Sequence, residues 1–416
     1  MPVMRDIGHL ATCRAGGGQG EIHPVEDAAV AWHDGRIEWA GPEAELPEAW
    51  EGEPSLSARG GLVVPGLVDA HTHLAFGGWR ADEFARRAAG ESYAEIAASG
   101  GGIASTVAAT RAASRRELAE RASGFLKAML SCGVTTVEAK SGYGLSAEEE
   151  LKLLRVYRHL RRATRVRVVP TFLGAHAVPP ERADDRDGLV EEIVRDWIPE
   201  VAGEGLARFC DVFVEEGAFR PAEARRVLEA GRRHGLAPKL HVDQLSDGGG
   251  AALAAELGAV SADHLEHVSY EGIEALAAAD TVAVLLPLAS LYLGQPAAPG
   301  RRMAEAGVPV AVATDFNPGT APSHHLPTAM TLACVREGLS PAGALKGATL
   351  FAARAAGEEE RIGSVEPGKA ADLAVFDAPD VPTWLQGLGV DRCVGTVAGG
   401  EVAWSAPGRP LADGVR

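Results

Sequence analysis

The chain has few cysteines, and none of them are clustered. Five occur among 416 residues, an odd number, and none stands in a CxxC pair. A disulfide framework uses an even set of cysteines, and a thiolate zinc site uses closely spaced pairs, so both are excluded. Scattered, unpaired cysteines are typical of a protein of a reducing compartment.

Positive charge and long apolar stretches are also scarce. Lys and Arg number 40 against 57 Asp and Glu, which gives a net charge of −17. Such a surface repels phosphate backbones, so neither nucleic acid nor an anionic membrane is expected as a partner. The longest apolar run, residues 281–294, is shorter than the roughly 20 residues of a bilayer span and predicts a buried strand. The first residues lack the apolar core of a signal peptide, and we expect a soluble, cytoplasmic protein.

The middle of the chain has the pattern of a parallel α/β protein. Apolar residues make up 46% of the sequence, enough for a sizeable core. Short β-branched runs alternate with longer helical patterns, which is typical of βαβ units. Eight candidate strands begin near residues 66, 134, 165, 210, 238, 259, 281 and 308. Eight such units predict a (β/α)8 TIM-like barrel. A doubly wound open sheet is the alternative, but no GxGxxG turn follows the first strand.

The two ends of the chain differ from the middle. Residues 1–64 and 362–416 hold short apolar runs separated by Gly, Pro and Asp-Gly turns, the chemistry of β-meanders. Neither end has enough apolar alternation to build a two-layer core alone. We therefore predict that residues 65–361 form the barrel, and that the two ends combine into one small β-sandwich domain beside it.

A His-Thr-His motif ends the first candidate strand. His71 and His73 are two residues apart, so both side chains share one face of the strand. Further along the chain, His241, His264 and Asp315 end the fifth, sixth and eighth candidate strands. Taken singly, each is an ordinary polar residue or helix cap. Together on the carboxyl rim of a barrel, where active sites lie, they predict a divalent-metal site with open positions.

Other residues near this rim suit the binding of a small polar molecule. Arg80 lies in the loop after the His-Thr-His motif, where a guanidinium suits bidentate binding of a carboxylate. Tyr143 is flanked by glycines, which let the backbone approach a ligand closely. The loop 317–320, beside Asp315, offers backbone donors and small residues for contact with a substrate.

Longer motifs resemble those of a known superfamily. The first strand unit reads PGLVDAHTHLAFGG, and the last apolar region reads GSVEPGKAADLAVFD. Between them stand CGVTTVEAKSGYGL, KLHVDQLSDGGGA, SADHLEHVS and TDFNPGT. With these motifs, from about residue 61 to 376, the sequence resembles the amidohydrolase superfamily. More narrowly, it resembles the branch that hydrolyses the cyclic amide of 4-imidazolone-5-propanoate to N-formimidoyl-L-glutamate in histidine degradation.

The resemblance implies roles for individual residues. It places the metal ligands at His71, His73, His241 and Asp315, which would hold one divalent or trivalent ion per subunit, zinc or iron. It places the substrate-contacting residues at Arg80, Tyr143, His176, Gln244, Asn317, Gly319 and Thr320. It places the catalytic roles at Asp315, His264 and Gln244.

Gln244 stands where the superfamily can have a proton-shuttling Glu. An amide can hold water or substrate by hydrogen bonds, but it cannot act as a general base. Proton transfer is therefore expected of Asp315 or His264, and His264 or the metal is expected to stabilise the oxyanion.

Three alternatives stay open at this point. Binuclear amidohydrolases bridge two metals with a carbamylated lysine of strand four, but Lys140 follows strand two and Glu215-Glu216 end strand four, which favours a mononuclear site. A deaminase of the same superfamily would favour Glu in place of Gln244 and would not require Arg80. A non-catalytic relative would have lost ligands, and none is lost. The resemblance also carries the expectation of a homodimer, which the sequence itself does not address.

Overall fold

A nearly closed barrel of eight parallel strands is the centre of the computed structural model, which describes residues 2–91, 95–96, 99–409 and 411. The strands follow one another around the barrel in chain order. They are β6 (Leu67–Thr72), β7 (Val134–Lys140), β8 (Arg167–Ala175), β9 (Phe209–Val214), β10 (Ala237–Val242), β11 (Ser261–His264), β12 (Val282–Leu285) and β13 (Val310–Val312). The circle is completed by a bridge between Thr72 and Phe316, which joins the first strand to the segment after the last.

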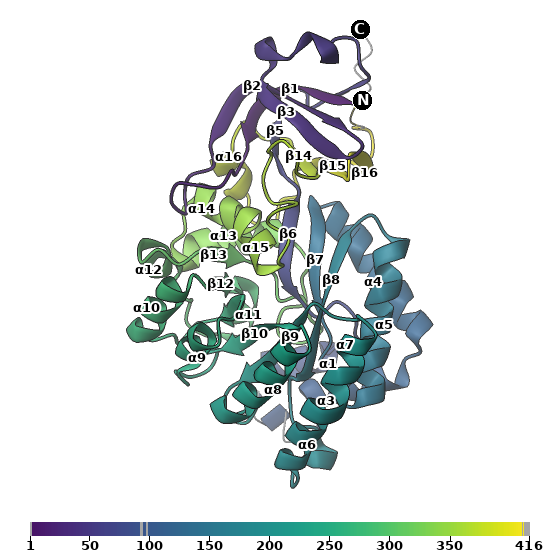
Figure 1. Ribbon diagram of the computed structural model, residues 1–416, viewed down its shortest axis with the longest axis vertical. Helices are drawn as coiled ribbons and strands as arrows, with labels where there is room; N and C mark the ends of the chain where they lie inside the picture. Colours follow the sequence, from purple (N-terminus) through teal and green to yellow (C-terminus); the bar gives the residue numbers. More distant parts are fainter. Residues whose placement is uncertain (1, 92–94, 97–98, 410, 412–416) are drawn as a thin grey trace.

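Helices cover the outside of this barrel (Figure 1). They are α1 (Ala81–Ala88), α3 (Ile103–Ala112), α4 (Arg115–Leu130), α5 (Ala147–Ala163), α6 (Arg186–Glu192), α7 (Ile198–Gly203), α8 (Pro221–Arg233), α9 (Gly250–Glu256), α10 (Tyr270–Ala279), α11 (Pro287–Leu293), α12 (Gly300–Glu305), α13 (Leu326–Glu337), α14 (Pro341–Gly347) and α15 (Leu350–Ala355). The helix α5 shows why these segments are helical. Three glutamates in its first turn and two arginines in its last turn match the helix dipole, and its leucines face the core.

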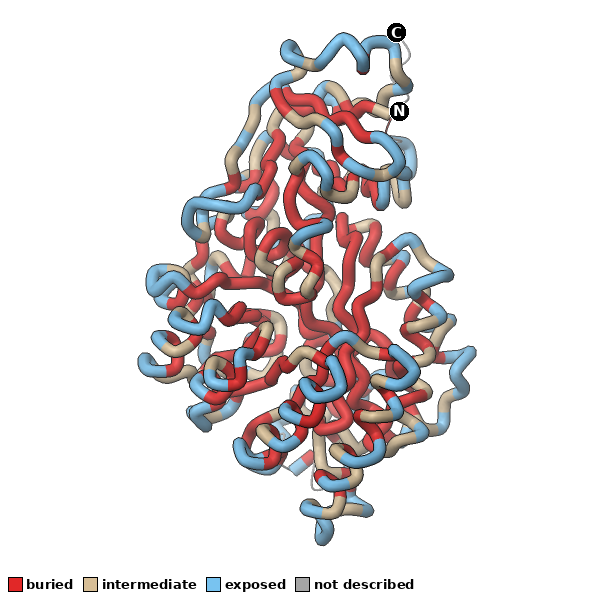
Figure 2. Tube along the Cα trace, in the orientation of Figure 1, coloured by how far each residue is buried: buried red, intermediate tan, exposed pale blue. Residues whose placement is uncertain are grey.

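The barrel strands are buried on both faces, as Figure 2 shows. All seven residues of β7 are buried, although they include Glu138 and Lys140. Burial on both faces explains why these strands read as continuous β-branched runs rather than alternating ones. The polar exceptions, Glu138 and Lys140, pair with residues of other strands inside the barrel.

The two ends of the chain form a second, mixed sheet at the other end of the molecule (Figure 1). Its strands are β1 (Val3–Ala11), β2 (Pro24–His33), β3 (Arg36–Pro42), β4 (Ser55–Ser57), β5 (Leu62–Pro65), β14 (Leu373–Phe376), β15 (Cys393–Ala398) and β16 (Glu401–Ser405), with α16 (Val381–Leu385) after β14. The hairpin β2–β3 turns at Asp34-Gly35, both with positive φ, as a two-residue Asp-Gly turn requires. Antiparallel pairing of β5 with β14 joins the two chain ends. The predicted fold class, a (β/α)8 barrel with a small β-sandwich domain built from both chain ends, is confirmed, and the strands of the smaller domain are joined in one mixed sheet.

A loop near the N-terminus is bound to the base of the barrel. The Gln19 side chain donates from Nε2 to the carbonyl of Val310 at 2.8 Å and accepts from the Val310 N–H at 3.1 Å. The Lys346 ammonium donates to the carbonyls of Gly16 and Gly18. The Gln19 amide thus takes the place of a neighbouring strand at the start of β13.

Two sequence expectations need correction. The apolar run 281–294 is not one strand: β12 ends at Leu285, and α11 begins at Pro287, because proline fits the first turn of a helix. The last barrel strand ends at Val312, so Asp315 lies in the segment after it rather than at its end. In the described part of the chain, no helix combines the length and hydropathy that crossing a membrane requires.

Candidate active site

The predicted His and Asp residues meet at the carboxyl rim of the barrel. His71 lies in β6, His241 in β10 and His264 at the end of β11. Backbone hydrogen bonds from the Asp315 N–H to the His71 carbonyl (3.0 Å) and from the His73 N–H to the Phe316 carbonyl (2.8 Å) bring Asp315 to the end of β6. Both His264 and Asp315 have positive φ, and such strain at non-glycine residues is a feature of functional sites.

Two buried carboxylates fix the orientation of two of these imidazoles. The Nδ1 of His71 lies 2.6 Å from Asp263 Oδ2, and the Nδ1 of His241 lies 3.1 Å from Asp211 Oδ1. A carboxylate only accepts hydrogen bonds, so each Nδ1 carries the proton and donates it. The Nε2 atom of each ring is therefore left as a lone pair, which is the form that binds a metal.

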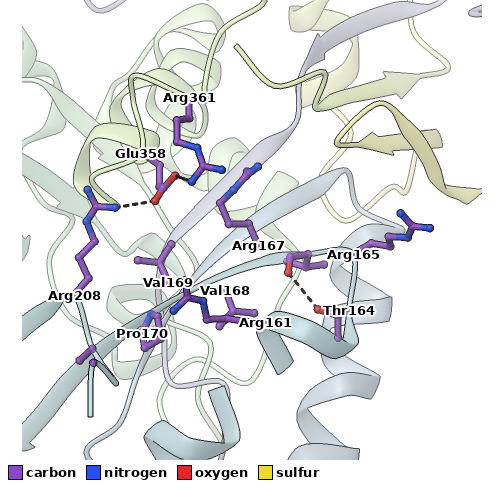
Figure 3. A pocket seen from close by; sticks show the side chains of 13 residues that line it. Arg161, Thr164, Arg165, Arg167, Val168, Val169, Pro170, Arg208, Glu358 and Arg361 are labelled. Carbon is purple, nitrogen blue, oxygen red and sulfur yellow. Dashed lines mark hydrogen bonds and ion pairs between the residues drawn. The ribbon is translucent and has the colours of Figure 1, made fainter. Parts of the chain in front are cut away.

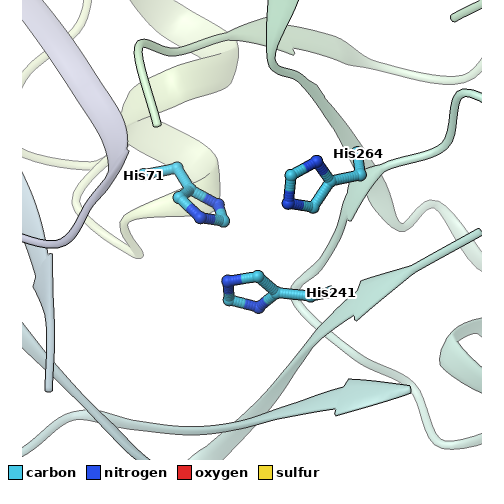
Figure 4. A group of neighbouring side chains, drawn as sticks. All are labelled: His71, His241 and His264. Carbon is cyan, nitrogen blue, oxygen red and sulfur yellow. The ribbon is translucent and has the colours of Figure 1, made fainter. Parts of the chain in front are cut away.

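These Nε2 atoms have no hydrogen-bond partner among the described residues, although both are buried. Figure 4 shows the rings of His71, His241 and His264 facing one common space. One ligand atom from each of the three lies within 4.8 Å of those of the others. A buried acceptor without a partner is costly unless a ligand satisfies it, so the donor set fits a metal ion.

A second group of three shares His71 with the first. It joins His71 to His73 and Asp315, again with ligand atoms within 4.8 Å. The Nε2 of His71 is 3.4 Å, and that of His73 is 3.5 Å, from Asp315 Oδ1. The two groups together contain the four predicted ligands and His264. Which four of the five bind the ion stays a prediction.

Burial sets the charge state of this cluster. It holds the pKa values of His71, His73 and His241 well below the ordinary value, and the charge of Lys140 acts in the same direction. The rings are therefore neutral at physiological pH. Burial also raises the pKa of Asp315, to about 7, although His264 opposes the shift.

A cavity of about 1330 Å³ opens above the cluster. Among the residues that line it are His73, Arg80, Tyr143, His176, His241, Gln244, His264, Asp315, Asn317 and Thr320. Of the predicted site residues, only His71 and Gly319 are not part of this lining. His71 lies directly below it, with its ring 4.5 Å from that of His241, and Gly319 lies against Arg80.

The Arg80 side chain is buried in the wall of this cavity. Its Nε lies 3.0 Å from Glu83 Oε2 of α1, an ion pair without hydrogen-bond geometry that keeps the guanidinium near the start of α1. A Cβ atom added to Gly319 would lie 1.9 Å from the Arg80 Cζ and 2.1 Å from its Nη2. Position 319 must therefore be glycine for Arg80 to keep this place. A buried guanidinium beside the metal-type cluster is suited to bind a carboxylate.

The rings of His176 and Tyr143 lie against the ring of His73. The His176 ring stacks on that of His73, with centroids 4.9 Å apart, and the Tyr143 ring is 5.4 Å from the same ring. Burial lowers the pKa of His176 to about 4, so its ring is neutral. Its Nδ1 lies 2.9 Å from the Gly142 carbonyl and must carry the proton, which leaves Nε2 as an acceptor.

The loop 317–320 uses its polar groups differently from the sequence expectation. The Asn317 Oδ1 accepts hydrogen bonds from the N–H groups of Gly319 (2.9 Å) and Thr320 (2.7 Å), and its Nδ2 donates to the Asp315 carbonyl. The donors that we expected to be exposed are thus engaged within the loop. Their contact with a substrate stays a prediction, whereas the Asn317 side chain holds the backbone of Asp315.

A second cavity lies at the opposite, amino ends of the barrel strands β8 and β9. Its volume is about 370 Å³, and its lining includes Arg161, Arg167, Arg208 and Arg361 (Figure 3). Arg208 and Arg361 both contact Glu358. The cavity contains none of the predicted site residues, so the chemistry of this barrel belongs to its carboxyl rim.

Sequence reasoning missed the groups that support the site. Asp211 and Asp263 orient two histidines, and Glu83 pairs with Arg80, yet none of the three was singled out. Asp263 directly precedes His264 and Asp211 lies inside a predicted strand, and a charged residue within a buried strand was the available signal. Their partners lie far away in the sequence, up to 192 residues for Asp263 and His71, so no local spacing connects them.

Comparison with known families agrees with this geometry. The profile of the family described as "Amidohydrolase family" matches residues 62–402, which include the whole barrel and every candidate site residue. The chain therefore belongs to the amidohydrolase family.

Curated relatives place it more narrowly. Imidazolonepropionase of Geobacillus thermodenitrificans is 48% identical over 92% of this chain and 91% of its own length. Imidazolonepropionase of Symbiobacterium thermophilum is 50% identical over 89% of this chain and 90% of its own length. The corresponding protein of Anaeromyxobacter sp. is 47% identical over 97% of this chain and 96% of its own. Within the amidohydrolase family, the chain belongs with the imidazolonepropionases.

Solved structures of distant relatives share the fold. Guanine deaminase of E. coli superposes with a TM-score of 0.72 at 18% identity, and covers 97% of this chain and 100% of that one. A 5-methylcytosine deaminase of Klebsiella pneumoniae superposes with a TM-score of 0.75 at 16% identity, and covers 97% of both chains. At such identities the likeness concerns the fold alone.

Proposed function

We propose that the protein hydrolyses the ring amide of 4-imidazolone-5-propanoate to N-formimidoyl-L-glutamate, a step of histidine degradation. The observation that supports this proposal most strongly is that one cavity is lined both by the His and Asp cluster, whose donor atoms suit a metal ion, and by the buried guanidinium of Arg80. The cluster suits hydrolysis of a carbonyl, and the guanidinium suits the propionate of this substrate. Its relatives among the imidazolonepropionases support the same assignment.

We propose one metal ion per subunit, zinc or iron, held by His71, His73, His241 and Asp315. When bound, such an ion polarises a carbonyl and lowers the pKa of water. Imidazole ligands suit both metals, so the donor set does not choose between them. Lys140 is engaged with three carboxylates below the rim, which argues against its use as a carbamylated bridge between two metals.

The chain's own groups divide the proton transfers between them. Asp315 takes a proton from the attacking water, whose oxygen bonds to the ring carbonyl carbon. The bond from that carbon to the ring nitrogen then breaks, and the proton passes to the departing nitrogen. His264 faces the same space, and although burial lowers its pKa, Glu266 outweighs that effect and raises it, so the ring can stabilise negative charge on the carbonyl oxygen. Gln244 holds the substrate or water by hydrogen bonds and moves no proton.

Binding of the substrate uses the rest of the cavity wall. Arg80 and Tyr143 anchor the propionate, and His176 offers its Nε2 lone pair to an N–H group of the ring. Anchoring the carboxylate at one side orients the ring carbonyl towards the cluster. We expect the partner to be this small molecule, with homodimer formation and a cytoplasmic location. All five cysteines, which lie in the described part of the chain, are unbridged, as in a reducing compartment.

The test combines a turnover assay with metal analysis of the purified protein. The loss of the ring absorbance of 4-imidazolone-5-propanoate should be accompanied by formation of N-formimidoyl-L-glutamate and should depend on bound metal. Guanine and cytosine serve as controls, and no ammonia should be released from them. Release of ammonia from either base, with no turnover of the imidazolone, would assign the protein to the deaminases instead.

A further inference from the structure

A layer of buried charges lies inside the barrel, directly below the rim. It contains the ammonium groups of Lys140 and Lys239 and the carboxylates of Glu138, Asp211 and Asp263, all with fully buried side chains. The interior of such a barrel is ordinarily filled by branched apolar residues. Burying five charges costs free energy even when they are paired, so a layer of this kind calls for a role that apolar residues could not serve.

Lys140 is the centre of this layer. Its Nζ donates to Asp211 Oδ2 at 2.7 Å and to Glu138 Oε1 at 3.0 Å, and it lies 3.3 Å from Asp263 Oδ2. Burial alone would lower the pKa of Lys140, but the three carboxylates outweigh it and hold the pKa above its ordinary value. The ammonium is therefore charged at physiological pH.

The two aspartates that Lys140 contacts are those that orient the imidazoles. Asp263 Oδ2 accepts from His71 Nδ1 at 2.6 Å, and this is the oxygen nearest to Lys140. Asp211 uses its other oxygen, Oδ1, for His241 Nδ1 at 3.1 Å. One ammonium group thus fixes both carboxylates, and each carboxylate fixes one imidazole, although the four partners come from the strands β6, β9, β10 and β11.

We propose that Lys140 is a positioning residue for the metal site: through Asp211 and Asp263 it fixes the rings of His71 and His241 so that both Nε2 atoms face the same point. The inference rests on the proposed metal site, but not on the identity of the substrate. Groups that hydrogen-bond to ligating histidines typically affect metal affinity or activity by about 10- to 100-fold. Lys140 acts one step further out, on two such groups at once.

Lys239 supplies a matched control within the same layer. It is equally buried, but its Nζ approaches Glu138 Oε1 and the Ala70 carbonyl at only 3.5 Å each, and it lies 5.1 Å from the centre of the Phe209 ring. Among the described residues, Lys239 has no hydrogen bond or ion pair with either of the two aspartates, although its charge acts on both from a longer distance. Removing either lysine leaves one ammonium among three carboxylates, so the general cost of unbalanced charge is similar, whereas the direct contacts with the two aspartates are lost only with Lys140.

The experiment measures zinc affinity of the full-length, metal-depleted protein by competition with a chromophoric chelator, without substrate. Lys140→Met should raise the zinc dissociation constant by about 10- to 100-fold, and Lys239→Met should raise it much less. Circular dichroism checks that both variants are folded. Combining Lys140→Met with Asp263→Asn should weaken zinc binding by less than the sum of the two single losses, because both changes act on the His71 ring, whereas only Lys140→Met also acts on His241 through Asp211.

Three outcomes would overturn the proposal. They are equal losses of zinc affinity in the two lysine variants, an unchanged affinity in Lys140→Met, and additive losses in the double variant. If Lys140→Met does not fold, Lys140→Gln takes its place. If neither Lys140 variant folds although Lys239→Met does, Lys140 is required for folding, and the proposal is also overturned. Since zinc binding is measured without substrate, a protein that failed to turn over the imidazolone would leave this comparison intact.

Discussion

Gly319 should control substrate binding through the position of the Arg80 side chain. A methyl group at this position would lie 1.9 Å from the Arg80 Cζ and 2.4 Å from its Nε, so Gly319→Ala must displace the guanidinium. The backbone of Gly319 does not have positive φ, so alanine brings no backbone strain of its own. Loss of a charge-assisted bidentate contact costs about 2–4 kcal/mol, or roughly 30- to 1000-fold in kcat/KM.

Steady-state kinetics with two substrates checks this reasoning. Gly319→Ala and Arg80→Ala should both lower kcat/KM for 4-imidazolone-5-propanoate, chiefly through KM. Both should resemble the unmodified protein on a ring analogue that lacks the propionate. The matched control is Gly248→Ala, in another loop of the carboxyl rim, whose added Cβ would lie at an ordinary 3.9 Å from the nearest atom, Asp243 Oδ1.

The double variant decides whether Gly319 acts through Arg80. If it does, Arg80→Ala with Gly319→Ala should be no worse than Arg80→Ala alone, because the displaced group is already absent. Additive losses in the double variant would refute the reasoning. So would an equal loss on the analogue without the propionate, since Arg80 would then have some role other than binding a carboxylate.

Three further predictions concern the cluster and the core. His71→Ala or His241→Ala should lose metal and activity but keep the fold; elemental analysis and circular dichroism test this, and a stoichiometric metal content would contradict it. Asp315→Asn should reduce kcat far more than Gln244→Ala, whose lost hydrogen bonds should raise the activation free energy by about 1–3 kcal/mol. If the pH profile of kcat/KM for Gln244→Ala lost its acidic limb, Asp315 would not be the general base. Burial raises the pKa of Glu337 well above its ordinary value, so the folded state binds a proton that the unfolded state releases, and stability falls as pH rises above the ordinary pKa. Glu337→Gln should therefore melt at a higher temperature than the unmodified protein at pH 8, with the difference narrowing towards pH 5, and equal melting curves at pH 8 would contradict this.

The parts of this structure that sequence could predict are those that depend on local pattern. All eight barrel strands lie where β-branched runs stand, because strands buried on both faces need such residues throughout. The prediction of one strand for the apolar run 281–294 was wrong, because its composition suits a strand and a buried helix equally. Only Pro287 marks the break between β12 and α11. Apolar content alone does not distinguish these two structures.

The residues of the site also fall into those that local sequence pattern predicts and those that only the fold reveals. The rim position of His71 and His241 follows from the ends of predicted strands, which is local information. The support of these rings by Asp263 and Asp211 depends on which strands become neighbours around the barrel and on which way each side chain points. No spacing along the chain encodes those contacts, so they appear only when the fold is known.

The Gln19 amide that pairs with Val310 has a consequence for how the chain folds. The two residues are 291 positions apart in the sequence. Likewise, the pairing of β5 with β14, in the middle of the second sheet, can form only after β14 has been synthesised. Contacts of such separation are slow to form, because the loop-closure entropy is paid before the contact is gained. During synthesis on a ribosome, Gln19 and β5 therefore emerge long before their partners, Val310 and β14. The last strand of the barrel and the sheet of the two ends should be completed together, as the final step of folding.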